Sequence, residues 1–417
     1  MKLSASLRKV KIALHWQILI GVLLGIAFGF VFPEYTNYTK WAGDLFLRGL
    51  KMVVIPLVFS ALVMGVTSVG KAADLGRIAG KTFAWYVTTT LIACVLGLLF
   101  VNLFKPGENV DLSLQETVTA GDLAVGKISF VDQIIAIVPD NIIKAMADGN
   151  MLPVIFFAIL FGFFVSLSSD KSRILLTDVF NSVYEVMIAI TFLVIRFAPI
   201  GLFGVASGMV GAQAGDAKAL GVMFGSLGIY SAIIAGGCLI QGFFVLPALF
   251  KLLTRKNPFV FMKMMGTALV TTFTTASSAA SLPISLRDIH EKAGVSQKIA
   301  GFCLPLGNTI NMNGTALFEC VTAIFIAQAY GIELTLVQQI IVILTSLLAA
   351  VGAAGIPLAG LVMMAVVLNA VGLPLEGIGL VLVVQQPLDM IRSAVNIWGD
   401  MTGAAIVAHS EGEKLNF

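Results

Sequence analysis

Apolar stretches long enough to cross a membrane recur along the chain, with short charged segments between them. An α-helix needs about 20 apolar residues to span a bilayer. Leu220–Phe250 runs for 31 residues without one charge. Other such stretches are His15–Phe32, Thr82–Phe104, Leu152–Leu167 and Val183–Val210. The pattern predicts an all-α polytopic membrane protein, with six conventional spans up to about Leu253.

The composition argues against the main alternative, a very large soluble helical core. Of the 417 residues 58% are hydrophobic and only 12% are charged, and the mean hydropathy is +0.97. A soluble domain carries roughly 25% charged residues. The four cysteines lie inside apolar stretches without CxxC spacing, which indicates small core residues rather than disulfides or zinc ligands.

Basic residues mark every second connection between the apolar stretches. The positive-inside rule places such connections in the cytoplasm, so we expect a multi-pass protein of the cell membrane with a cytoplasmic N-terminus. The first stretch is full length and lacks a small-residue cleavage site, so we expect it to remain as a span. The basic residues are Lys2, Arg8, Lys9 and Lys11; Lys71, Arg77 and Lys81; Lys171 and Arg173; Lys251, Arg255 and Lys256.

The pattern changes beyond Leu253, where two uncharged segments are unsuited to a single span. Thr271–Pro283 reads TTFTTASSAASLP, and its hydroxyl groups and proline predict a hairpin that enters the membrane and turns back. Irregular backbone at that depth is tolerated only where protein or a water-filled cavity surrounds it. Leu334–Leu375 holds 42 uncharged residues, about 63 Å as one helix, so it must break near AAVGAAGIPLAG at Ala349–Gly360.

Each hairpin precedes an apolar helix that polar residues interrupt. The polar segments are NTINMNGT at Asn308–Thr315 and RSAVNIWGD at Arg392–Asp400. Two hairpin-plus-broken-helix units in succession match the inverted repeats of secondary transporters, whose binding site lies between the repeats near the membrane midplane. Small-residue hairpins also serve as plain helix-packing surfaces, but the repeated order of the two units favours a transporter.

Polar residues of the last helix predict a binding site. At about 100° per residue, six of them fall on one face: Gln385, Asp389, Arg392, Ser393, Asn396 and Asp400. Asp389 and Arg392 could neutralise one another at i,i+3 spacing. That alternative leaves Asn396 and Asp400 unexplained, and an ionisable group such as Asp400 in the membrane costs about 2.5–3.5 kcal/mol. A site for a zwitterion and a cation explains the whole face. Arg offers a fork to a carboxylate, Asp389 accepts from an ammonium group, and Asp400 offers oxygen to a small cation.

Four segments follow in order along the second half of the chain: TTASSAASLP, GNTINMNGTALFE, GAAGIPLAG and DMIRSAVNIWGDMTG. They resemble the signature segments of the dicarboxylate/amino acid:cation symporter family, which contains glutamate and aspartate transporters. The resemblance covers essentially the whole chain, including TNYTKWAGDLFLRGLKMVVIPLVFSALV at Thr36–Val63. It implies eight transmembrane helices with two re-entrant helical hairpins, a homotrimer, and uptake of acidic amino acids coupled to sodium ions.

The same resemblance implies an elevator mechanism, in which one domain moves across the membrane against a fixed scaffold. Residues 1–76, with spans one and two, and residues 129–216, with spans four and five, would form the scaffold. Residues 77–128 would contribute span three and an external loop to the transport domain. Residues 217–417 would complete it with span six, both hairpins and spans seven and eight.

Carried over by position, the resemblance implies one substrate site and three sodium sites. The substrate would contact Ser277, Ser278, Met312, Thr315, Ile356, Gly360, Asp389, Arg392, Ser393 and Asn396. One sodium ion would lie at Gly307, Asn311, Asn396 and Asp400, a second at Thr309, Ala350, Val351 and Ala353, and a third at Tyr86, Thr89, Thr90, Asn311 and Asn313. Asp389 would take the amino group of the substrate, and Arg392 with Thr315 its side-chain carboxylate.

Several positions that bear on ion coupling depart from the family pattern. Sodium-coupled members usually have aspartate where this chain has Asn313, whose amide brings no charge, so we expect weaker coupling at the third site. Many members have an arginine at 276 or 390, where this chain has Ala276 and Met390. Glu319 stands where some members have a proton-carrying glutamate, and we expect it to be buried and to carry a proton. The alternative is a glutamate near the extramembrane end of its helix, hydrated or hydrogen-bonded to Gln241.

Other functions account for the sequence less well. A C4-dicarboxylate has no ammonium group, so Asp389 would repel it unless protonated. A neutral amino acid would leave Arg392 as a buried unpaired charge. An ion channel needs a pore lined by several chains, whereas Asp and Arg alternate here on one helix. Nothing indicates an enzyme, because no nucleophile–base pair or metal cluster lies in the apolar segments. No cofactor and no nucleic-acid partner is expected.

Overall fold

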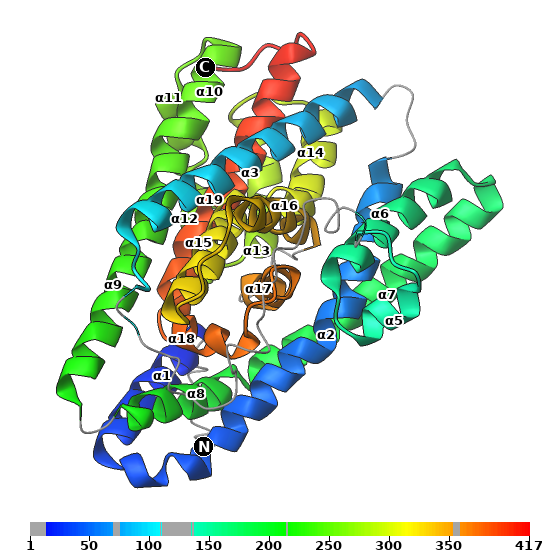
Figure 1. Ribbon diagram of the computed structural model, residues 1–417. Coiled ribbons are helices and arrows are strands. Elements are labelled where there is room, and N and C mark those ends of the chain that lie inside the picture. The colour runs from blue at the N-terminus through cyan, green and yellow to red at the C-terminus, as the bar shows by residue number, and fades with distance from the viewer. Residues whose placement is uncertain are drawn as a thin grey trace, which may run out of the picture.

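The computed structural model is helical throughout the part of the chain that it describes, which comprises residues 14–69, 76–108, 110, 135, 137–213, 216–352 and 359–417 (Figure 1). Five helical runs within these residues are long and apolar enough to cross a membrane, by length and composition. They are Asn37–Met64, Arg77–Phe104, Asp170–Arg196, Lys218–Thr254 and Gln297–Ala329. The prediction of an all-α chain with several apolar spans is therefore confirmed.

One group of helices packs around α2. It consists of α1 (Leu14–Val31), η1 (Pro33–Tyr35), α2 (Asn37–Val69), α5 (Ile142–Ala147), α6 (Met151–Leu167), α7 (Asp170–Arg196) and α8 (Ala198–Ala212). Glycines on α1 let the backbones of α1 and α8 approach closely, because a methyl group added at Gly29 would lie 2.7 Å from the carbonyl oxygen of Ser207. Small residues at such spacing are a common means of packing helices inside a membrane.

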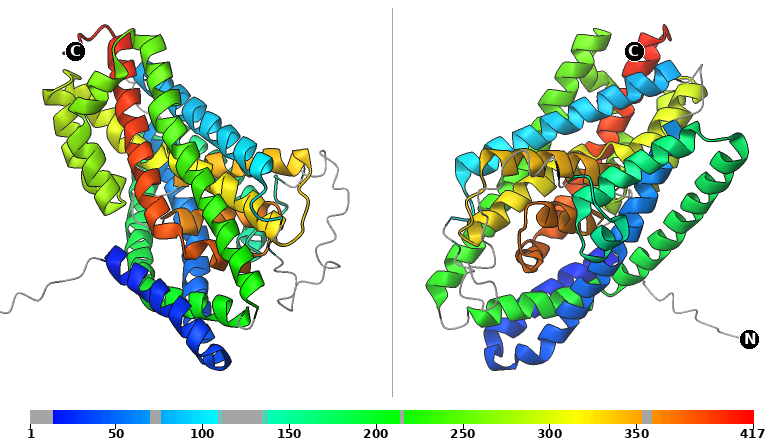
Figure 2. Two further views of the ribbon diagram at one scale, coloured as in Figure 1. Left: turned by 90° about the vertical axis from the view of Figure 1, so that its left-hand side faces the viewer. Right: turned by 45° about the vertical axis from the view of Figure 1, so that its right-hand side comes forward.

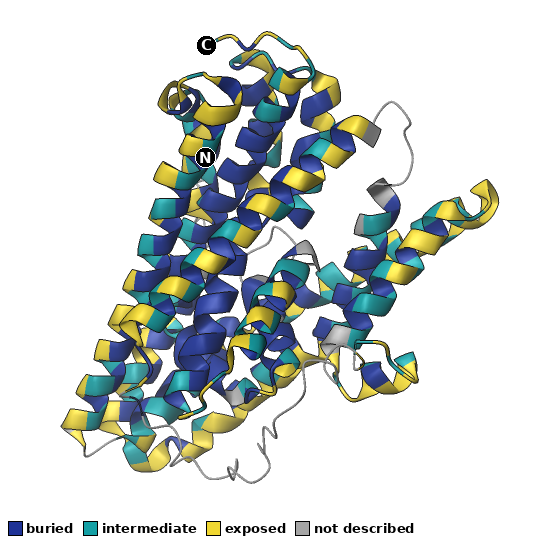
Figure 3. Cartoon of the chain, turned by 45° about the horizontal axis from the view of Figure 1, so that its top comes forward, coloured by how far each residue is buried: buried dark blue, intermediate teal, exposed yellow. Residues whose placement is uncertain are grey.

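A second group packs around α15 and α19 (Figure 2). It consists of α3 (Gly76–Phe104), α9 (Ala217–Ile240), the π-helix η2 (Gln241–Val245), α10 (Leu246–Thr254), α11 (Pro258–Met264), α12 (Gly266–Thr275), α13 (Ser278–Glu291), α14 (Gln297–Ile310), α15 (Asn313–Ala329) and α19 (Gln385–Ser410). Figure 3 shows that helices at the centre are almost wholly buried. In α15 only Gln328 is not classed as buried, so this helix is enclosed by protein on all sides.

A third set of helices contacts both groups. It consists of α16 (Leu336–Gly352), α17 (Ala359–Ala370), η3 (Leu375–Gly377) and α18 (Ile378–Leu382). The helices α16 and α17 pack on each other, on α2 of the first group and on α15 of the second. The two groups are therefore joined through this set as well as by contacts between α2 and α14.

Both breaks predicted in the uncharged segments occur. The helices α12 and α13 pack against each other, and the chain turns between them at Ala276, whose φ of 50° lies in the left-handed region. The turn comes before Pro283, which lies inside α13 rather than at the bend. The helices α16 and α17 also form a packed pair. Residues 353–358, which connect them, lie outside the described part of the chain.

Two expectations about helix continuity were wrong. Val183–Val210 is not one span, because α7 ends at Arg196 and α8 begins at Ala198. Pro199 accounts for the break, since it has no N–H to continue the helical ladder. The last helix is not broken either: α19 runs without interruption through Arg392–Asp400. This segment has no proline, and the Asn396 side chain bonds α15 instead of competing for its own backbone.

The ends of α3 and α19 are tied together at the top of Figure 1. Lys81 Nζ donates to Glu411 Oε1 at 2.7 Å, and the Arg77 guanidinium donates to the same carboxylate. The hydrogen bond from Arg77 and, to a smaller extent, that from Lys81 lower the pKa of Glu411 to about 2. As predicted, the four cysteines are buried and free: Cys94, Cys238, Cys303 and Cys320.

Candidate functional site

The polar face predicted for the last helix is turned into the protein. All six of its residues are buried: Gln385, Asp389, Arg392, Ser393, Asn396 and Asp400. Arg392 is 1% exposed and Asp400 is not exposed at all. Because ionisable groups in membrane proteins face the interior or a cavity and mark functional sites, this face is the natural starting point.

The break between α14 and α15 lies against this face. Asn311 and Met312 leave the helical conformation, with ψ angles of 84° and 63°. The backbone N–H of Gly314 then donates to Asn396 Oδ1 at 2.8 Å. Gly314 is required here, because an added methyl group would lie 2.6 Å from the carbonyl oxygen of Arg392. The break is therefore hydrogen-bonded to α19, and the two backbones lie close together at Gly314 and Arg392.

Arg392 forms the centre of the predicted substrate site. Its Nη2 donates to Asp389 Oδ1 at 2.5 Å, and its guanidinium carbon lies 3.9 Å from the centre of the Phe318 ring. Its Nε and Nη1 have no hydrogen-bond partner among the described residues. Neutralisation by Asp389 therefore uses only part of a group that carries five N–H donors. The Phe318 ring that supports the cation was not predicted, since an aromatic residue in an apolar helix gives no signal.

Two further predicted ligands lie beside Arg392. A methyl group added at Gly360 of α17 would lie 2.9 Å from Arg392 Nη1 and 3.3 Å from Thr315 Cγ2. Thr315 Oγ1 accepts from Asn396 Nδ2 at 3.1 Å. Three helices, α15, α17 and α19, thus bring these four residues together. Ile356 lies outside the described residues.

The serines of the first hairpin stand at its turn. Ser277 caps α13 and accepts from the Ala280 N–H at 3.2 Å, while Ser278 is 3% exposed. The hydroxyl groups of Thr272 and Ser281, 2.5 Å apart, fasten α12 to α13. Both helices pack against α19. The predicted serines are therefore buried on the hairpin that faces the polar helix.

Two residues of the first predicted sodium site, Gly307 and Asn311, lie against Asp400, whereas the Asn396 side chain bonds α15. Asp400 Oδ1 accepts from Asn311 Nδ2 at 2.8 Å, and Asp400 Oδ2 has no hydrogen-bond partner among the described residues. A methyl group at Gly307 would lie 2.6 Å from Asp400 Cγ and 2.7 Å from Tyr86 Oη. Buried carboxylate oxygens are almost always satisfied, so the orphaned Oδ2 fits a cation ligand.

Four of the five residues of the third predicted site converge between α3 and the α14–α15 break, whereas Tyr86 Oη donates to the Cys303 carbonyl at 2.7 Å. Thr90 Oγ1 donates to Asn313 Oδ1 at 2.8 Å, and both Thr89 and Thr90 lie 3.5 Å from Asn311 Oδ1. Asn313 Nδ2 has no partner within the described chain. An amide in place of a carboxylate therefore leaves one end of the side chain unused.

Sequence reasoning missed Gly399 and Trp85, which shape this region. A methyl group at Gly399 would lie 2.6 Å from Asn313 Nδ2 and 2.9 Å from Asn311 Nδ2. Trp85 Nε1 donates to the Gly399 carbonyl at 3.0 Å. The small residue directly before Asp400 in WGD was the available signal, since glycine permits close approach.

The second predicted sodium site is only partly described. Thr309 of α14 donates its hydroxyl hydrogen to the Leu306 carbonyl at 2.9 Å. Ala350 is buried on α16, which contacts α14, and Val351 is the next residue of the same helix. Ala353 lies outside the described residues.

Glu319 is fully buried, and neither of its carboxylate oxygens has a hydrogen-bond partner among the described residues. The alternative of a hydrated glutamate, or one bonded to Gln241, is wrong. Gln241 Nε2 donates instead to the Thr89 carbonyl at 3.0 Å, and its Oε1 has no partner in the described chain.

Comparison with known proteins agrees with the geometry. The family model described as the sodium:dicarboxylate symporter family matches residues 14–410. A proton/sodium-glutamate symport protein of Bacillus caldotenax is 36% identical over 97% of this chain and 96% of its own length. The proton/glutamate-aspartate symporter of Escherichia coli strain K12 is 33% identical, covering 97% and 94%. Human excitatory amino acid transporter 2 is 33% identical, covering 95% and 78%. The chain belongs to the sodium:dicarboxylate symporter family.

Proposed function

We propose that this protein is a secondary active symporter that takes up aspartate or glutamate coupled to sodium ions. The observation that carries the proposal is the buried Arg392, which has two nitrogens without partners in the described chain and an acidic neighbour, Asp389, one turn away. An acidic amino acid supplies a carboxylate to the first and an ammonium group to the second. Relatives that span nearly the whole chain are named as glutamate or glutamate-aspartate symporters, which supports the same cargo.

In this proposal the substrate lies between the two hairpins and α19. Arg392 and Thr315 bind its side-chain carboxylate, Asp389 its amino group, and Asn396, Ser393 and the turn serines its α-carboxylate. Gly360 supports the proposal because the absence of a side chain lets the α17 backbone lie close to Arg392 and Thr315. The turn serines are Ser277 and Ser278, and the remaining proposed contacts are Met312 and Ile356.

Sodium ions bind behind the substrate. The orphaned Oδ2 of Asp400, close to Gly307 and Asn311, supports the first site. The set of hydroxyl and amide oxygens on Thr89, Thr90 and Asn313 supports the third, without a carboxylate. The second is assigned to backbone oxygens of α14 and α16. Glu319 is the group that carries a proton, and its burial without a hydrogen-bond partner in the described chain supports that role.

The proposed architecture has eight spans and two re-entrant hairpins, α12–α13 and α16–α17. Residues 1–76 and 129–216 form a scaffold, and residues 77–128 and 217–417 form a transport domain that moves as an elevator within a homotrimer. The packing of α1, α2, α6, α7 and α8 as one group and of α3, α9–α15 and α19 as another supports this division. The N-terminus is cytoplasmic, on the charge pattern of the connections.

A C4-dicarboxylate is the second candidate cargo, because the family description includes dicarboxylates. Succinate has the two carboxylates of aspartate but no ammonium group, so it leaves Asp389 facing an anion. Binding of labelled aspartate to the purified protein, in competition with unlabelled aspartate, glutamate and succinate at pH 7, distinguishes the two. We expect succinate to compete at least tenfold more weakly, since one charge-assisted bond is worth about 1.5–3 kcal/mol. Equal competition would assign a dicarboxylate cargo.

A further inference from the structure

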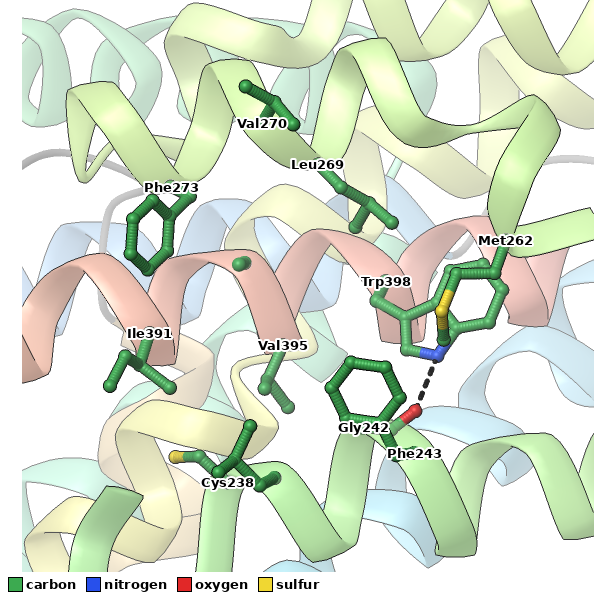
Figure 4. A pocket seen from close by; sticks show the side chains of 12 residues that line it. Cys238, Gly242, Phe243, Met262, Leu269, Val270, Phe273, Ile391, Val395 and Trp398 are labelled. Atoms are coloured by element: carbon green, nitrogen blue, oxygen red, sulfur yellow. Dashed lines mark hydrogen bonds between the residues drawn. The ribbon is translucent and has the colours of Figure 1, made fainter. Parts of the chain in front are cut away.

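An apolar cavity of about 420 Å³ lies outside the substrate and sodium sites (Figure 4). Three elements line it: the α9–η2 junction, the α11–α12 segment of the first hairpin, and the face of α19 that carries Ile391 and Val395. Its volume falls within the range of about 300–1,000 Å³ that is usual for small-molecule sites. None of the residues assigned to substrate or ions lines it.

The cavity wall offers almost nothing to a polar ligand. The one side-chain N–H of the wall belongs to Trp398, and its Nε1 already donates to the Gly242 carbonyl at 3.0 Å, as the dashed line in Figure 4 shows. That carbonyl stands at the π-helix η2, where the regular helical hydrogen bonding changes. Because both polar groups satisfy each other, the part of a ligand inside the cavity must be hydrocarbon.

The cavity opens on the outer surface of the chain. Several side chains of its wall are large, apolar and exposed, among them Phe243 at 48%, Val270 at 63% and Phe273 at 42%. In a protein that crosses the membrane with these helices, such a surface meets lipid chains. Water is not a suitable occupant, since it needs two to four polar partners.

Exposed lysines stand at one end of the same elements. Lys263 directly follows Met262, which lines the cavity, and Lys251 lies on α10, eight residues or about 12 Å beyond Phe243. The two lysines belong to chain segments that meet, because the rings of Phe250 and Phe261 stack with centres 5.1 Å apart. Neither lysine has an acidic partner among the described residues.

We propose that this cavity binds one acyl chain of an anionic phospholipid, whose phosphate contacts Lys251 and Lys263. Bilayer chains are as apolar as the cavity wall, so the hydrocarbon part adds fit but no selectivity. Selectivity comes from the lysines, because each lysine near an anionic headgroup raises the affinity for that lipid about fivefold. The bound lipid contacts α12, α9 and α19 together and so stabilises the packing of the first hairpin. The proposal requires only the membrane location and does not depend on the cargo.

The test measures lipid binding to the purified full-length protein by native mass spectrometry in detergent. Dioleoyl-phosphatidylglycerol and dioleoyl-phosphatidylcholine are added separately, and the thermal unfolding midpoint is recorded with each. We expect one tightly bound phosphatidylglycerol, weaker phosphatidylcholine, and a higher midpoint with the former. Lys251→Gln and Lys263→Gln should each weaken phosphatidylglycerol binding about fivefold. The matched control Lys171→Gln, an exposed lysine on α7, should not.

Two substitutions fill the cavity itself. Gly242→Leu enters it from η2, where the first added carbon meets only Val395 at 3.5 Å, an ordinary contact. Val270→Trp enters from the exposed rim and carries little risk to folding. Both substitutions should abolish the tight binding of phosphatidylglycerol. Gly228→Leu, at an exposed position of α9 with nothing within 4 Å, should leave that binding unchanged. The proposal is overturned if both filled variants bind the lipid like the parent. It is also overturned if the two lipids bind equally, or if the filled variants change the number of subunits in the assembly rather than lipid binding.

Discussion

In the proposed function, Arg392 is the residue on which recognition of an acidic substrate depends. It is buried, it is supported by the Phe318 ring, and it is only partly used by Asp389. A buried guanidinium with free donors is costly unless an anion completes its hydrogen bonding. The sequence predicted this role because a guanidinium fork on the polar face of an apolar helix is suited to a carboxylate. It could not predict that Asp389 would remain bonded to the same group.

Replacing Arg392 by alanine should weaken aspartate binding roughly ten- to hundredfold, because one charge-assisted hydrogen bond is lost. Arg392→Lys keeps the charge but not the planar fork, so its aspartate affinity should lie between those of the parent protein and Arg392→Ala. The measurement is isothermal titration of the purified protein with aspartate in excess sodium. Arg196→Ala removes an exposed arginine on α7 and serves as control. Unchanged aspartate affinity in Arg392→Ala would remove the residue from the site.

In the proposed function, Asn313 sets the strength of the third sodium site. Its Oδ1 accepts from Thr90 and its Nδ2 has no partner in the described chain. Asn313→Asp restores a charge there, so the dependence of aspartate affinity on sodium concentration should become steeper. Asn150→Asp, at an exposed helix start, is the matched control. Should the Hill slope and the apparent sodium affinity both stay at parental values, position 313 is not a sodium ligand in this protein.

Glu319 is suited to carry a proton because it is buried without a hydrogen-bond partner in the described chain. The neutral acid is far cheaper to keep in such surroundings than the carboxylate. Glu319→Gln imitates the protonated acid without an exchangeable proton. Sodium-driven aspartate uptake in this variant should become insensitive to pH between about 5 and 8. Glu185→Gln, an exposed glutamate on α7, should keep the parental profile. If Glu319→Gln keeps it too, the residue is structural.

At the scale of elements, the length of the uncharged segments was a better guide to the helices than local signals such as a proline or a polar run. The 42-residue uncharged segment had to be divided, and α16 and α17 divide it. Hydroxyl groups marked the first hairpin correctly, but Pro283 did not mark its turn, which Ala276 makes in a left-handed conformation. The polar run Arg392–Asp400 suggested a broken helix, yet α19 is continuous because Asn396 finds partners on α15. Partners from distant segments are invisible to a local pattern.

The close contact between the α14–α15 break and α19 gives a prediction at this scale. In Gly314→Ala the added methyl group would lie 2.6 Å from the Arg392 carbonyl oxygen and 2.8 Å from its Cα. Because backbone cannot move aside cheaply, α15 and α19 must separate, and such overpacking costs about 1–3 kcal/mol. We expect a lower unfolding midpoint and weaker aspartate binding. Gly301→Ala on α14 has open space and should change neither. Parental aspartate affinity in Gly314→Ala would show that this contact does not position the site.

At the scale of the whole molecule, two groups of helices meet through α16 and α17. The proposed substrate and sodium residues that the structure describes lie on α3, on α19 and on or beside α13–α17, and none lies on α1, α2, α6, α7 or α8. This separation is what a carrier with a fixed scaffold and a moving binding domain requires. Hydropathy predicted the apolar helices, and the ordered motifs predicted residues that the structure brings close to one another, such as Asn311 and Asp400. The contact between the groups had no motif to mark it.

The most direct test of this account is uptake of labelled aspartate into liposomes that contain the purified protein. Sodium and pH gradients are imposed separately, with choline replacing sodium outside when the proton gradient acts alone. The account predicts concentrative, saturable aspartate uptake under an inward sodium gradient, and little uptake under a proton gradient without sodium. Full uptake driven by protons alone, with external sodium wholly replaced by choline, would contradict it.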